Sequence, residues 1–248
     1  MIGRHKARVV ALVQARMGST RLPGKVLREL AGTTMLEHVV GRLRRATTID
    51  DVVTATSVLP ADDAVADLCR RRNIACFRGS EADVLERFLQ AARAFSADVV
   101  VRITADCPLI DPAVVDEVVE ALLSTPDCEY ASNVLPQRTY PRGLDAEAFD
   151  VDLLERLDRE DRNPAWRQHV TEMVFQQPER FRIFNVVASE DLSRHRWTVD
   201  TAEDFALAAE IFARFGSRPF GLDEVLAFLD ERPSLSALNA HVVQKAPF

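Results

Sequence analysis

Residues 9–25 read VVALVQARMGSTRLPGK, a short apolar run that passes at once into a polar loop. The run is rich in β-branched residues and is long enough for one buried strand. The loop carries the cations Arg16, Arg21 and Lys25 among glycine, serine and threonine residues. Glycines let main-chain N–H groups approach a phosphate closely, hydroxyl groups add donors, and cations balance the negative charge. The stretch therefore predicts a strand of an open α/β sheet whose following loop binds nucleotide phosphates.

Two well-known phosphate-binding loops do not match this stretch. The G-x-x-x-x-G-K-[ST] spacing of a Walker A loop is absent, and so is the G-x-G-x-x-G pattern of dinucleotide-binding folds. The alternative interpretation is a basic connection between a strand and a helix, with its charges in solvent. Three cations among small residues, directly after a buried strand, favour the phosphate-binding interpretation.

The composition is that of an ordinary α/β protein. The 248 residues are 47% hydrophobic and 28% charged, which fits one domain with a substantial core. The net charge of −7 and the scattered arginines argue against nucleic-acid binding. No stretch has the length of a membrane span, and four cysteines without metal-ligand spacing suit a reducing compartment. The basic start of the chain leads straight into the first strand and does not resemble a signal peptide, so we expect a cytoplasmic protein.

Strand-like and helix-like segments alternate through the first half of the chain. Thr34 and Asp111 are typical helix N-caps, the first with Glu37 three residues on and the second followed by Pro112. This alternation predicts a mostly parallel sheet with helices on both faces. The expected strands are 9–13, 51–56, 75–77 and 98–103, and the expected helices are 34–45, 62–72, 83–95 and 111–123.

The alternation ends after Ser124, and the second half has a mixed pattern. We expect residues 146–149 to pair at an edge of the sheet, and the tail from Pro233 to be loosely held. No repeat or linker interrupts the chain, so we expect a single domain over residues 1–248. The further expected strands are 129–133, 181–187 and 196–199, and the further expected helices are 151–157, 164–176, 201–215 and 222–229.

Two aspartates follow predicted strands. Asp106 comes directly after the most apolar strand, where open α/β sheets bind their ligands. A carboxylate there, near a cationic phosphate loop, is suited to hold Mg²⁺ that binds phosphate oxygens; the alternative is an aspartate that forms a local turn. Asp200 precedes a predicted helix, where an aspartate is ordinarily a cap. Thr201 and Asp204, three residues apart, are further capping residues at the start of the same helix.

Residues 14–25, QARMGSTRLPGK, resemble the nucleotide-binding loop of the CMP-sugar synthetases, which are the CMP-KDO and CMP-acylneuraminate cytidylyltransferases. The similarity is greatest to their relatives assigned to spore-coat polysaccharide synthesis. Residues 104–112, TADCPLIDP, resemble the family's metal-aspartate segment, and residues 199–204, VDTAED, resemble the segment of its second metal-binding carboxylate. The resemblance spans about residues 9–215. It implies a Rossmann-like sheet of the nucleotide-diphospho-sugar transferase type, with a small dimerisation excursion in the second half, and a homodimer.

The resemblance also implies roles for particular residues. Asp106 and Asp200 would share one Mg²⁺, and the cations of the loop would hold the triphosphate. Thr104 is a departure, because the CMP-KDO enzymes carry a glutamine two residues before the metal aspartate, so base and acceptor preference do not follow from that branch. For Arg78 the alternative is a surface salt bridge. The implied catalytic residues are Arg16, Lys25, Asp106 and Asp200, and the implied nucleotide-binding residues are Gln14, Ala15, Arg16, Gly18, Ser19, Thr20, Arg21, Lys25, Arg78, Ser80 and Thr104.

The acceptor is expected in the second half of the chain. The pattern Y-P-x-G-L-D-x-E at 140–147 and the segment RQHVT at 167–171 resemble the spore-coat branch. Carboxylates there can accept hydrogen bonds from sugar hydroxyls, and an arginine can pair with an anionic group. The alternatives are a structural aspartate that ties down an edge strand and a structural histidine. The implied acceptor-binding residues are Arg138, Tyr140, Asp145, Glu147 and His169.

These observations predict a Mg²⁺-dependent nucleotidyltransferase that moves CMP from CTP to a sugar or sugar acid and releases pyrophosphate. Such a transfer depends on in-line positioning and charge neutralisation. Residues 1–125 would bind the nucleotide, and residues 126–232 the acceptor and a second subunit. The alternatives are another base or a sugar 1-phosphate acceptor, and a non-catalytic nucleotide- or sugar-binding protein on the same fold.

Overall fold

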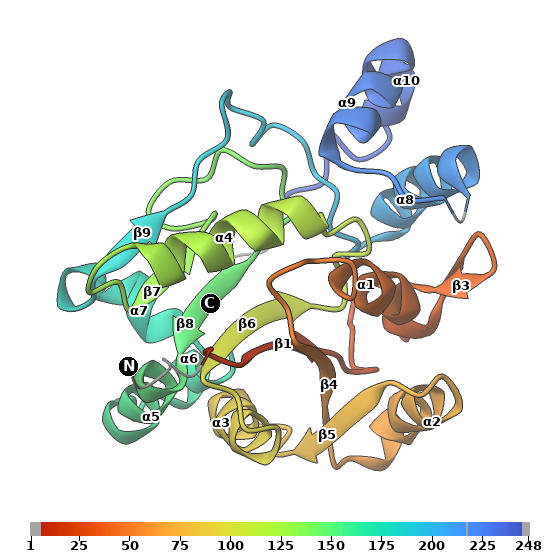
Figure 1. The fold of residues 1–248 in the computed structure, drawn as a ribbon. Coiled ribbons are helices and arrows are strands. Elements are labelled where there is room, and N and C mark those ends of the chain that lie inside the picture. Colours follow the sequence, from red (N-terminus) through yellow and green to blue (C-terminus); the bar gives the residue numbers. More distant parts are fainter. Residues whose placement is uncertain (1–5, 217, 245–248) are drawn as a thin grey trace.

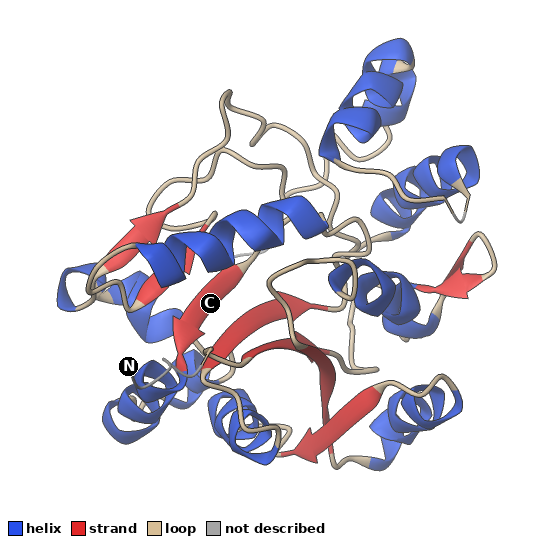
Figure 2. Cartoon of the chain, viewed as in Figure 1, coloured by secondary structure: helices blue, strands red, loops and turns tan. Residues whose placement is uncertain are grey.

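Seven strands form the central sheet, in the order β5-β4-β1-β6-β8-β7-β9 (Figures 1 and 2). This computed structural model describes residues 6–216 and 218–244; residues 1–5, on which the signal-peptide expectation partly rests, lie outside the described residues. The predicted mostly parallel α/β sheet is confirmed. Four strands pair in parallel: β1 (Val9–Gln14), β4 (Asp51–Ser57), β5 (Ala75–Gly79) and β6 (Val99–Thr104). Next to them, β8 (Glu147–Asp150) runs antiparallel to both β6 and β7 (Tyr130–Ser132), and β9 (Ile183–Asn185) runs parallel to β7. A separate hairpin joins β2 (Glu29–Leu30) and β3 (Thr33–Thr34).

Most helices begin where the sequence predicts, because local capping signals fix their first residues. Thr34 and Thr201 each form a capping box with the acidic residue three positions further on. Asp111 accepts a hydrogen bond from a first-turn N–H, and proline occupies the first helical position after it. The helices of the described residues are α1 (Met35–Leu43), α2 (Asp63–Arg71), α3 (Val84–Ala94), α4 (Pro112–Ser124), α5 (Val151–Glu160), α6 (Pro164–Arg167), α7 (Glu172–Gln176), α8 (Ala202–Phe215), α9 (Leu222–Glu231) and α10 (Pro233–Ser236), with single 3₁₀ turns at Lys25–Leu27, Pro60–Asp62 and Pro178–Arg180.

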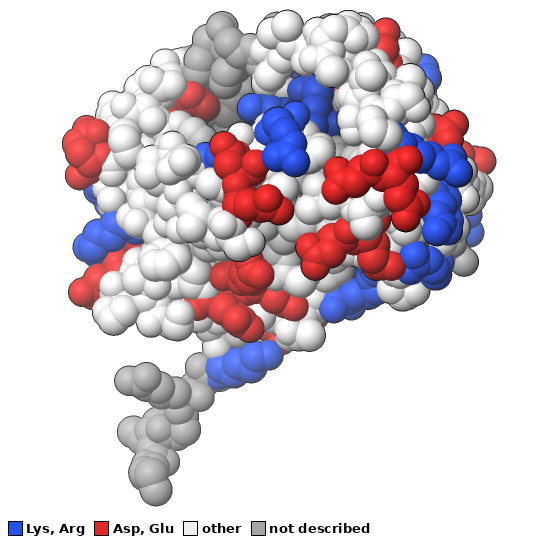
Figure 3. Space-filling view, turned by 90° about the horizontal axis from the view of Figure 1, so that it is seen from above, with Lys and Arg blue, Asp and Glu red and all other residues white. Residues whose placement is uncertain are grey.

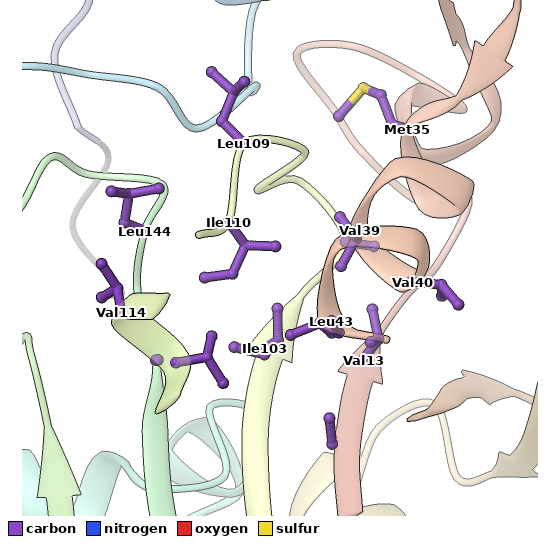
Figure 4. Packing of buried hydrophobic residues seen from close by; sticks show 14 of the residues in the cluster. Val13, Met35, Val39, Val40, Leu43, Ile103, Leu109, Ile110, Val114 and Leu144 are labelled. Carbon is purple, nitrogen blue, oxygen red and sulfur yellow. The ribbon is translucent and has the colours of Figure 1, made fainter. Parts of the chain in front are cut away.

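Helices cover both faces of the sheet because successive side chains of each strand point to opposite faces. Val13 of β1 belongs to a core cluster that includes residues of α1, α4 and α8, whereas Leu12 belongs to a second cluster that includes residues of α3 and α5. Figure 4 shows the first of these cores, where Val13 and Ile103 of the sheet lie close to Val39 of α1. The two cores hold β1 and β6 rigidly, so the loops after these strands start from fixed points.

Strand β8 corrects the prediction that residues 146–149 pair at an edge. It lies inside the sheet, between β6 and β7, and both neighbours are antiparallel to it. The register places Arg102 of β6 opposite Glu147 of β8, and the two side chains form an ion pair. A cross-strand pair of opposite charges stabilises this register, and the edge of the sheet passes to β9 instead.

Residues 196–199 do not form the predicted strand. They are extended but pair only through an isolated bridge between Arg142 and Arg196. The backbone at Gly143 approaches that of Thr198 so closely that a Cβ atom at Gly143 would lie 2.4 Å from the Thr198 nitrogen. Gly143 also has a φ of +109°. Glycine is required where the chain adopts such a conformation against a neighbouring backbone. The main chain of Val199 then donates to the Asp106 carbonyl at 2.8 Å, which docks this segment beside the end of β6.

The helix predicted at 164–176 is broken into α6 and α7. Val170, which is buried, has a φ of 61°, and a β-branched residue in that region interrupts a helix. The break leaves Gln168 and His169 between the two helices. The tail is also better held than predicted, because Asn239 is buried and its Nδ2 donates to the Arg196 carbonyl at 2.9 Å and to Asp204 at 2.8 Å.

None of the helices in the described part of the chain combines the length and the apolar character needed to span a bilayer.

Candidate active site

A cleft of about 490 Å³ opens at the carboxyl ends of β1 and β6. Open α/β sheets bind ligands at this edge, and the volume falls within the range of small-molecule sites. The loop after β1 contributes most of the lining, and the break between α6 and α7 contributes Gln168 and His169. The lining residues are Gln14, Arg16, Gly18, Ser19, Thr20, Arg21, Lys25, Val26, Thr104, Ala105, Asp106, Gln168, His169, Asp200 and Gln244.

The loop after β1 is held in shape by its own backbone and by one buried carboxylate. The Met17 carbonyl accepts from the main-chain nitrogens of Ser19 and Gly24 at 2.9 and 3.2 Å. The Met17 N–H donates to Asp62, which is 3% exposed, at 2.7 Å. Gly24 has a φ of 67°, a conformation that favours glycine. Within the described residues the Thr20 N–H donates to no protein atom, so the fixed loop keeps a main-chain donor available for an anion.

Lys25 lies between the two aspartates that the sequence singled out. Its Nζ donates to Asp106 Oδ2 at 2.8 Å, to Asp200 Oδ1 at 2.8 Å and to the Val199 carbonyl at 2.9 Å. The Lys25 side chain is 10% exposed, whereas those of Asp106 and Asp200 are 26% and 14% exposed. We call Lys25, Asp106 and Asp200 the cleft triad. Two carboxylates far apart in the sequence thus converge on one cationic nitrogen.

Burial opposes the charged forms in the cleft triad, yet the ion pairs prevail. Desolvation alone would lower the pKa of Lys25, but the charges and hydrogen bonds of Asp106 and Asp200 raise this pKa above its ordinary value. Desolvation alone would raise the pKa of Asp106, but the Lys25 ammonium and hydrogen bonds from Lys25 and Thr104 lower it. The lysine therefore stays protonated and Asp106 stays ionised at neutral pH.

Two arginines flank Asp200. Arg21 of the loop pairs with its Oδ2 at 3.0 Å, and Arg196 pairs with the same oxygen at 2.9 Å. Arg196 is itself held by Asp204, through Nε at 2.9 Å and the second amino group at 3.0 Å. The Asp204 side chain is fully buried at the start of α8, which also confirms the predicted capping role. The position of Asp200 is therefore fixed from the helix as well as from the cleft.

Most residues predicted to bind the nucleotide line the cleft, from Gln14 at the end of β1 to Thr104 at the end of β6. Ala15 is buried beneath the loop at 1% exposure. Arg16 lies at the rim with 53% of its side chain exposed, and its contact with Glu81 is long at 3.4 Å. This side chain can turn to a ligand at little cost.

Arg78 and Ser80 are placed outside the lining of the cleft. The Arg78 guanidinium donates to the Ser57 carbonyl at 2.9 Å and pairs with Asp63 at 2.7 Å, which fits the salt-bridge alternative. The Ser80 hydroxyl accepts from the Asp83 N–H at 3.0 Å, just before α3. Contact of either residue with a nucleotide stays a prediction.

The predicted acceptor region pairs largely with itself. Arg138 and Asp145 form a two-fold hydrogen-bonded ion pair at 2.5 and 2.8 Å. Tyr140 is 5% exposed and its hydroxyl donates to Glu117 of α4 at 2.6 Å. These partners lie within the protein, and the assignment of the three residues to the acceptor stays a prediction.

Glu147 belongs to a set of polar side chains that bond one another. It pairs with Arg102, and its carboxylate accepts from the Tyr130 hydroxyl at 2.8 Å and from the Thr171 hydroxyl. We call these four residues the buried network. His169 is the member of the predicted acceptor set that lines the cleft. Burial, reinforced by the Arg102 charge, lowers the pKa of His169, so its ring is neutral at pH 7.

Some residues at the site were not identified from the sequence. Gln168 lines the cleft beside His169, and its place in the segment RQHVT was the available signal. Gln244 lines the cleft from the far end of the chain, where no pattern pointed to it. Asp62 and Arg196 support the site without lining it: Asp62 accepts from the Met17 N–H of the loop, and Arg196 donates to Asp200. Only the fold brings these partners together.

The chemistry of the cleft is that of a site for a polyanion and a cation. Among the described residues no group of three or more His, Cys, Asp and Glu side chains could hold a metal by itself. Asp106 and Asp200 supply two carboxylates, and Mg²⁺ is typically bound by one or two carboxylates together with water and substrate phosphates. The ammonium of Lys25 already occupies the point on which both carboxylates converge. The two carboxylates would therefore hold a cation only if the Lys25 ammonium turned away from them.

Comparisons with known proteins agree with this geometry. A family model described as cytidylyltransferase matches residues 10–218. An uncharacterized protein of Methanocaldococcus jannaschii is 35% identical over 241 residues, which cover 96% of this chain and 97% of that protein. The spore coat polysaccharide biosynthesis protein SpsF of Bacillus subtilis is 32% identical over 234 residues, or 91% of this chain and 95% of that protein. A cytidylyltransferase from Leptospira borgpetersenii has a similar structure, with a TM-score of 0.88, 36% identity, and coverage of 92% of this chain and 96% of that one.

The family match begins inside β1 and ends just beyond α8, so it takes in the loop, both aspartates and the whole sheet. The relatives align over nearly their full lengths. This chain therefore belongs to the cytidylyltransferase family, and it is a nucleotidyltransferase enzyme.

Proposed function

We propose that this enzyme transfers CMP from CTP to a sugar or sugar-acid acceptor, with Mg²⁺ and with release of pyrophosphate, in the synthesis of a polysaccharide or glycoconjugate precursor. The observation that carries the proposal is the cleft triad, in which two carboxylates share one cation beside a loop of anion-binding donors. The family supports the cytidylyl group. The name of the Bacillus relative, which refers to spore coat polysaccharide, supports a sugar acceptor.

The donor set fits Mg²⁺. Asp106 and Asp200 would hold the ion, and the Lys25 ammonium, which now bonds both carboxylates, would turn to a phosphate oxygen. Bound there, Mg²⁺ would supply positive charge against the α-phosphate and the departing pyrophosphate. Burial and paired arginines keep Asp200 in place, so the site is organised before the substrate arrives.

The remaining residues would bind and orient the nucleotide. Arg16, Arg21 and the loop N–H groups would hold the triphosphate, and Gln14 and Thr104 would lie beneath it at the strand ends. An acceptor hydroxyl would attack the α-phosphorus; the new O–P bond forms as the bond to the β-phosphate oxygen breaks, and the hydroxyl proton is released. Such a reaction needs positioning and electrostatic stabilisation more than covalent catalysis.

The acceptor would enter beside Gln168 and His169, which line the part of the cleft contributed by the second half of the chain. Residues 1–125 would then serve mainly the nucleotide, and residues 126–232 the acceptor and the interface of a homodimer. In this division Arg138, Tyr140, Asp145 and Glu147 shape the acceptor wall through the contacts described above. We propose a cytoplasmic location for this reaction.

Pyrophosphate release tests the proposal. The purified enzyme would be given CTP, Mg²⁺ and a panel of sugar acids, neutral sugars and sugar 1-phosphates, with ATP, GTP and UTP in parallel. We expect release only with CTP and a sugar or sugar-acid acceptor, and none in excess EDTA. Equal rates with all four nucleotides would contradict the base preference, and full activity in EDTA would contradict the metal. A sugar 1-phosphate as the best acceptor would contradict the acceptor class.

A further inference from the structure

A second cavity, of about 210 Å³, lies beside the candidate active site. The segment 193–197 lines it together with Arg142, residues of α8, α9 and α10, and the chain after α10. Arg196 lines this cavity and pairs with Asp200 of the active-site cleft, and Gln244 lines both spaces. In Figure 3, which views the molecule of Figure 1 from above, Lys and Arg side chains gather around a hollow between groups of Asp and Glu. The cavity exceeds the space needed for a single water molecule many times over.

Two residues that line this cavity, Trp197 and His195, each carry a buried ring nitrogen without a partner in the described part of the chain. Among the described residues neither Trp197 Nε1 nor His195 Nε2 has a hydrogen-bond partner. Trp197 is 3% exposed, and the two rings lie with their centroids 5.8 Å apart. An unsatisfied buried donor costs about 1–3 kcal/mol. Both nitrogens are covered by neighbouring atoms, so an occupant would bond them only after the rings shift.

The backbone that carries both rings is firmly held. The Arg142 carbonyl accepts from the nitrogens of Trp197 and Thr198 at 2.6 and 3.0 Å, and the Arg142 N–H donates to the His195 carbonyl at 3.0 Å. The close approach at Gly143 locks the same pair of segments together. The backbone at this wall of the cavity is therefore fixed.

The charge around the cavity selects the kind of occupant. Three arginines line it, and no aspartate or glutamate does so among the described residues. Arg196 is neutralised by Asp200 and Asp204. The Arg142 guanidinium makes no hydrogen bond or ion pair with any residue that the structure describes.

The acidic side chains near the cavity are committed elsewhere or lie outside it. Asp145, which attracts Arg142 through space, is already bound by Arg138. Glu190 and Asp230 interact electrostatically with His195, but neither residue lines the cavity. Burial and the charges of Arg138 and Arg196 lower the pKa of Arg142. A negatively charged occupant would offset this repulsion, whereas a cation would add to it.

We propose that this cavity binds a small anion through a carboxylate or phosphate group, held by the Arg142 guanidinium next to the Trp197 and His195 rings. An oxyanion supplies acceptor atoms and a counter-charge for Arg142 at the same time. The site is separate from the cleft that holds the triphosphate loop, so its occupancy does not depend on the reaction proposed above.

The indole N–H resonances report on the site directly. The chain has two tryptophans, and Trp166 of α6 does not line the cavity, so it serves as an internal reference. The ¹⁵N-labelled protein would be titrated with inorganic phosphate and, separately, with acetate, at constant ionic strength set by sodium chloride. We expect the Trp197 signal, assigned with Trp197→Phe, to move saturably with one or both anions while the Trp166 signal stays in place.

Substitutions separate this site from the cleft. Arg142→Met should raise the dissociation constant obtained from the Trp197 signal by about tenfold or more, which is the effect of losing one charge-assisted hydrogen bond. Arg159→Met, an exposed arginine of α5, should leave it unchanged, and so should Lys25→Met, because Lys25 does not line the cavity. A Trp197 signal that neither anion moves in the wild type, or that titrates identically in Arg142→Met, would overturn the proposal. The wild-type titration decides the matter even if Arg142→Met does not fold.

Discussion

The cleft triad and the buried network are built from the same kinds of side chain, but they face different surroundings. Each holds a cation against carboxylate, and each joins segments that are distant in the sequence. Asp106 of the triad is 26% exposed and lines a cleft, whereas the Glu147 side chain is 7% exposed and its oxygens are filled by protein donors. A ligand in the cleft can replace the partners of the triad directly, whereas it would have to displace buried protein donors to bind Glu147.

This difference shows that access, more than residue type, decides what an ion pair does. A buried ion pair is stable only while every partner is present, because removal of one leaves a charge without compensation. An ion pair at a cleft can exchange partners with a substrate or a metal at a smaller cost. We therefore expect substitutions in the triad to affect turnover, and substitutions in the network to affect folding.

The largest expected effect is on turnover in Asp106→Asn. Loss of one carboxylate from the proposed metal site should reduce kcat/KM about a thousandfold or more, since a bound metal contributes several kcal/mol to the transition state. The variant should remain folded, with a modest decrease in melting temperature because the Lys25–Asp106 ion pair is lost. Asp67→Asn, a half-exposed aspartate of α2, is the control and should retain full activity. Wild-type turnover in Asp106→Asn would remove the metal mechanism.

Next in size is the loss of stability in Glu147→Ala. This change leaves Arg102 buried beside an unfilled space, and breaking such a pair costs about 3–5 kcal/mol. Urea unfolding should show this decrease, whereas Glu120→Ala on the exposed side of α4 should change stability by less than about 0.5 kcal/mol. If Glu147→Ala is as stable as the wild type but loses acceptor binding, Glu147 belongs to the site and the comparison fails.

Lys25→Met should separate binding of the nucleotide from binding of the metal. Loss of the ammonium removes a charge-assisted contact of about 1.5–3 kcal/mol, which is about tenfold or more in affinity for CTP. The same change leaves Asp106 and Asp200 without their shared cation, so Mg²⁺ should raise the melting temperature more than it does in the wild type.

The control for that experiment is Lys6→Met, because Lys6 lies at the surface with 78% of its side chain exposed. It should show the wild-type response to both CTP and Mg²⁺, measured by calorimetry and by thermal shift. Unchanged CTP affinity in Lys25→Met would place the triphosphate elsewhere.

A smaller effect is expected in His169→Ala. A neutral hydrogen bond contributes about 0.5–1.5 kcal/mol, so the acceptor KM should rise about twofold to tenfold. The KM for CTP should stay the same, because the nucleotide contacts that we propose come from the loop after β1. Equal changes in both Michaelis constants would show that His169 acts on the structure of the cleft as a whole.

The smallest expected effect is the response of the cleft triad to pH near neutrality. Asp106 has a lowered pKa in the folded state, so its contribution to stability is present above its unfolded pKa of about 3.9 and is lost as pH falls through the folded value. Lys25 has a raised pKa, so its contribution is present below about 10.4 and is lost as pH rises through the folded value.

The difference in the free energy of unfolding between the wild type and Asp106→Asn should therefore be constant from about pH 5 to pH 9 and should shrink below about pH 4. Urea unfolding across this range measures it. A change of this difference around pH 7 would mean that the triad is not fully charged as the structure indicates.

Much of the fold could be predicted from the sequence because its signals are local. The apolar run of β1, the capping residues Thr34, Asp111 and Thr201, and the alternation of strands and helices each depend on neighbours along the chain. The same holds for Asp106, since a carboxylate directly after a buried strand must emerge at the ligand-binding edge. Local chemistry thus determined the parallel half of the sheet and one wall of the site.

Only the tertiary structure decided the second half. The position of β8 inside the sheet depends on pairing with β6 across more than forty intervening residues, and residues 196–199 are held at Gly143 instead of forming a strand. Arg138 and Asp145 looked free to bind a ligand, yet they bind each other, while Gln244 reaches the cleft from the chain end. A charged side chain carries no local sign of its partner, because that partner is set by which distant segments the fold brings within hydrogen-bond distance.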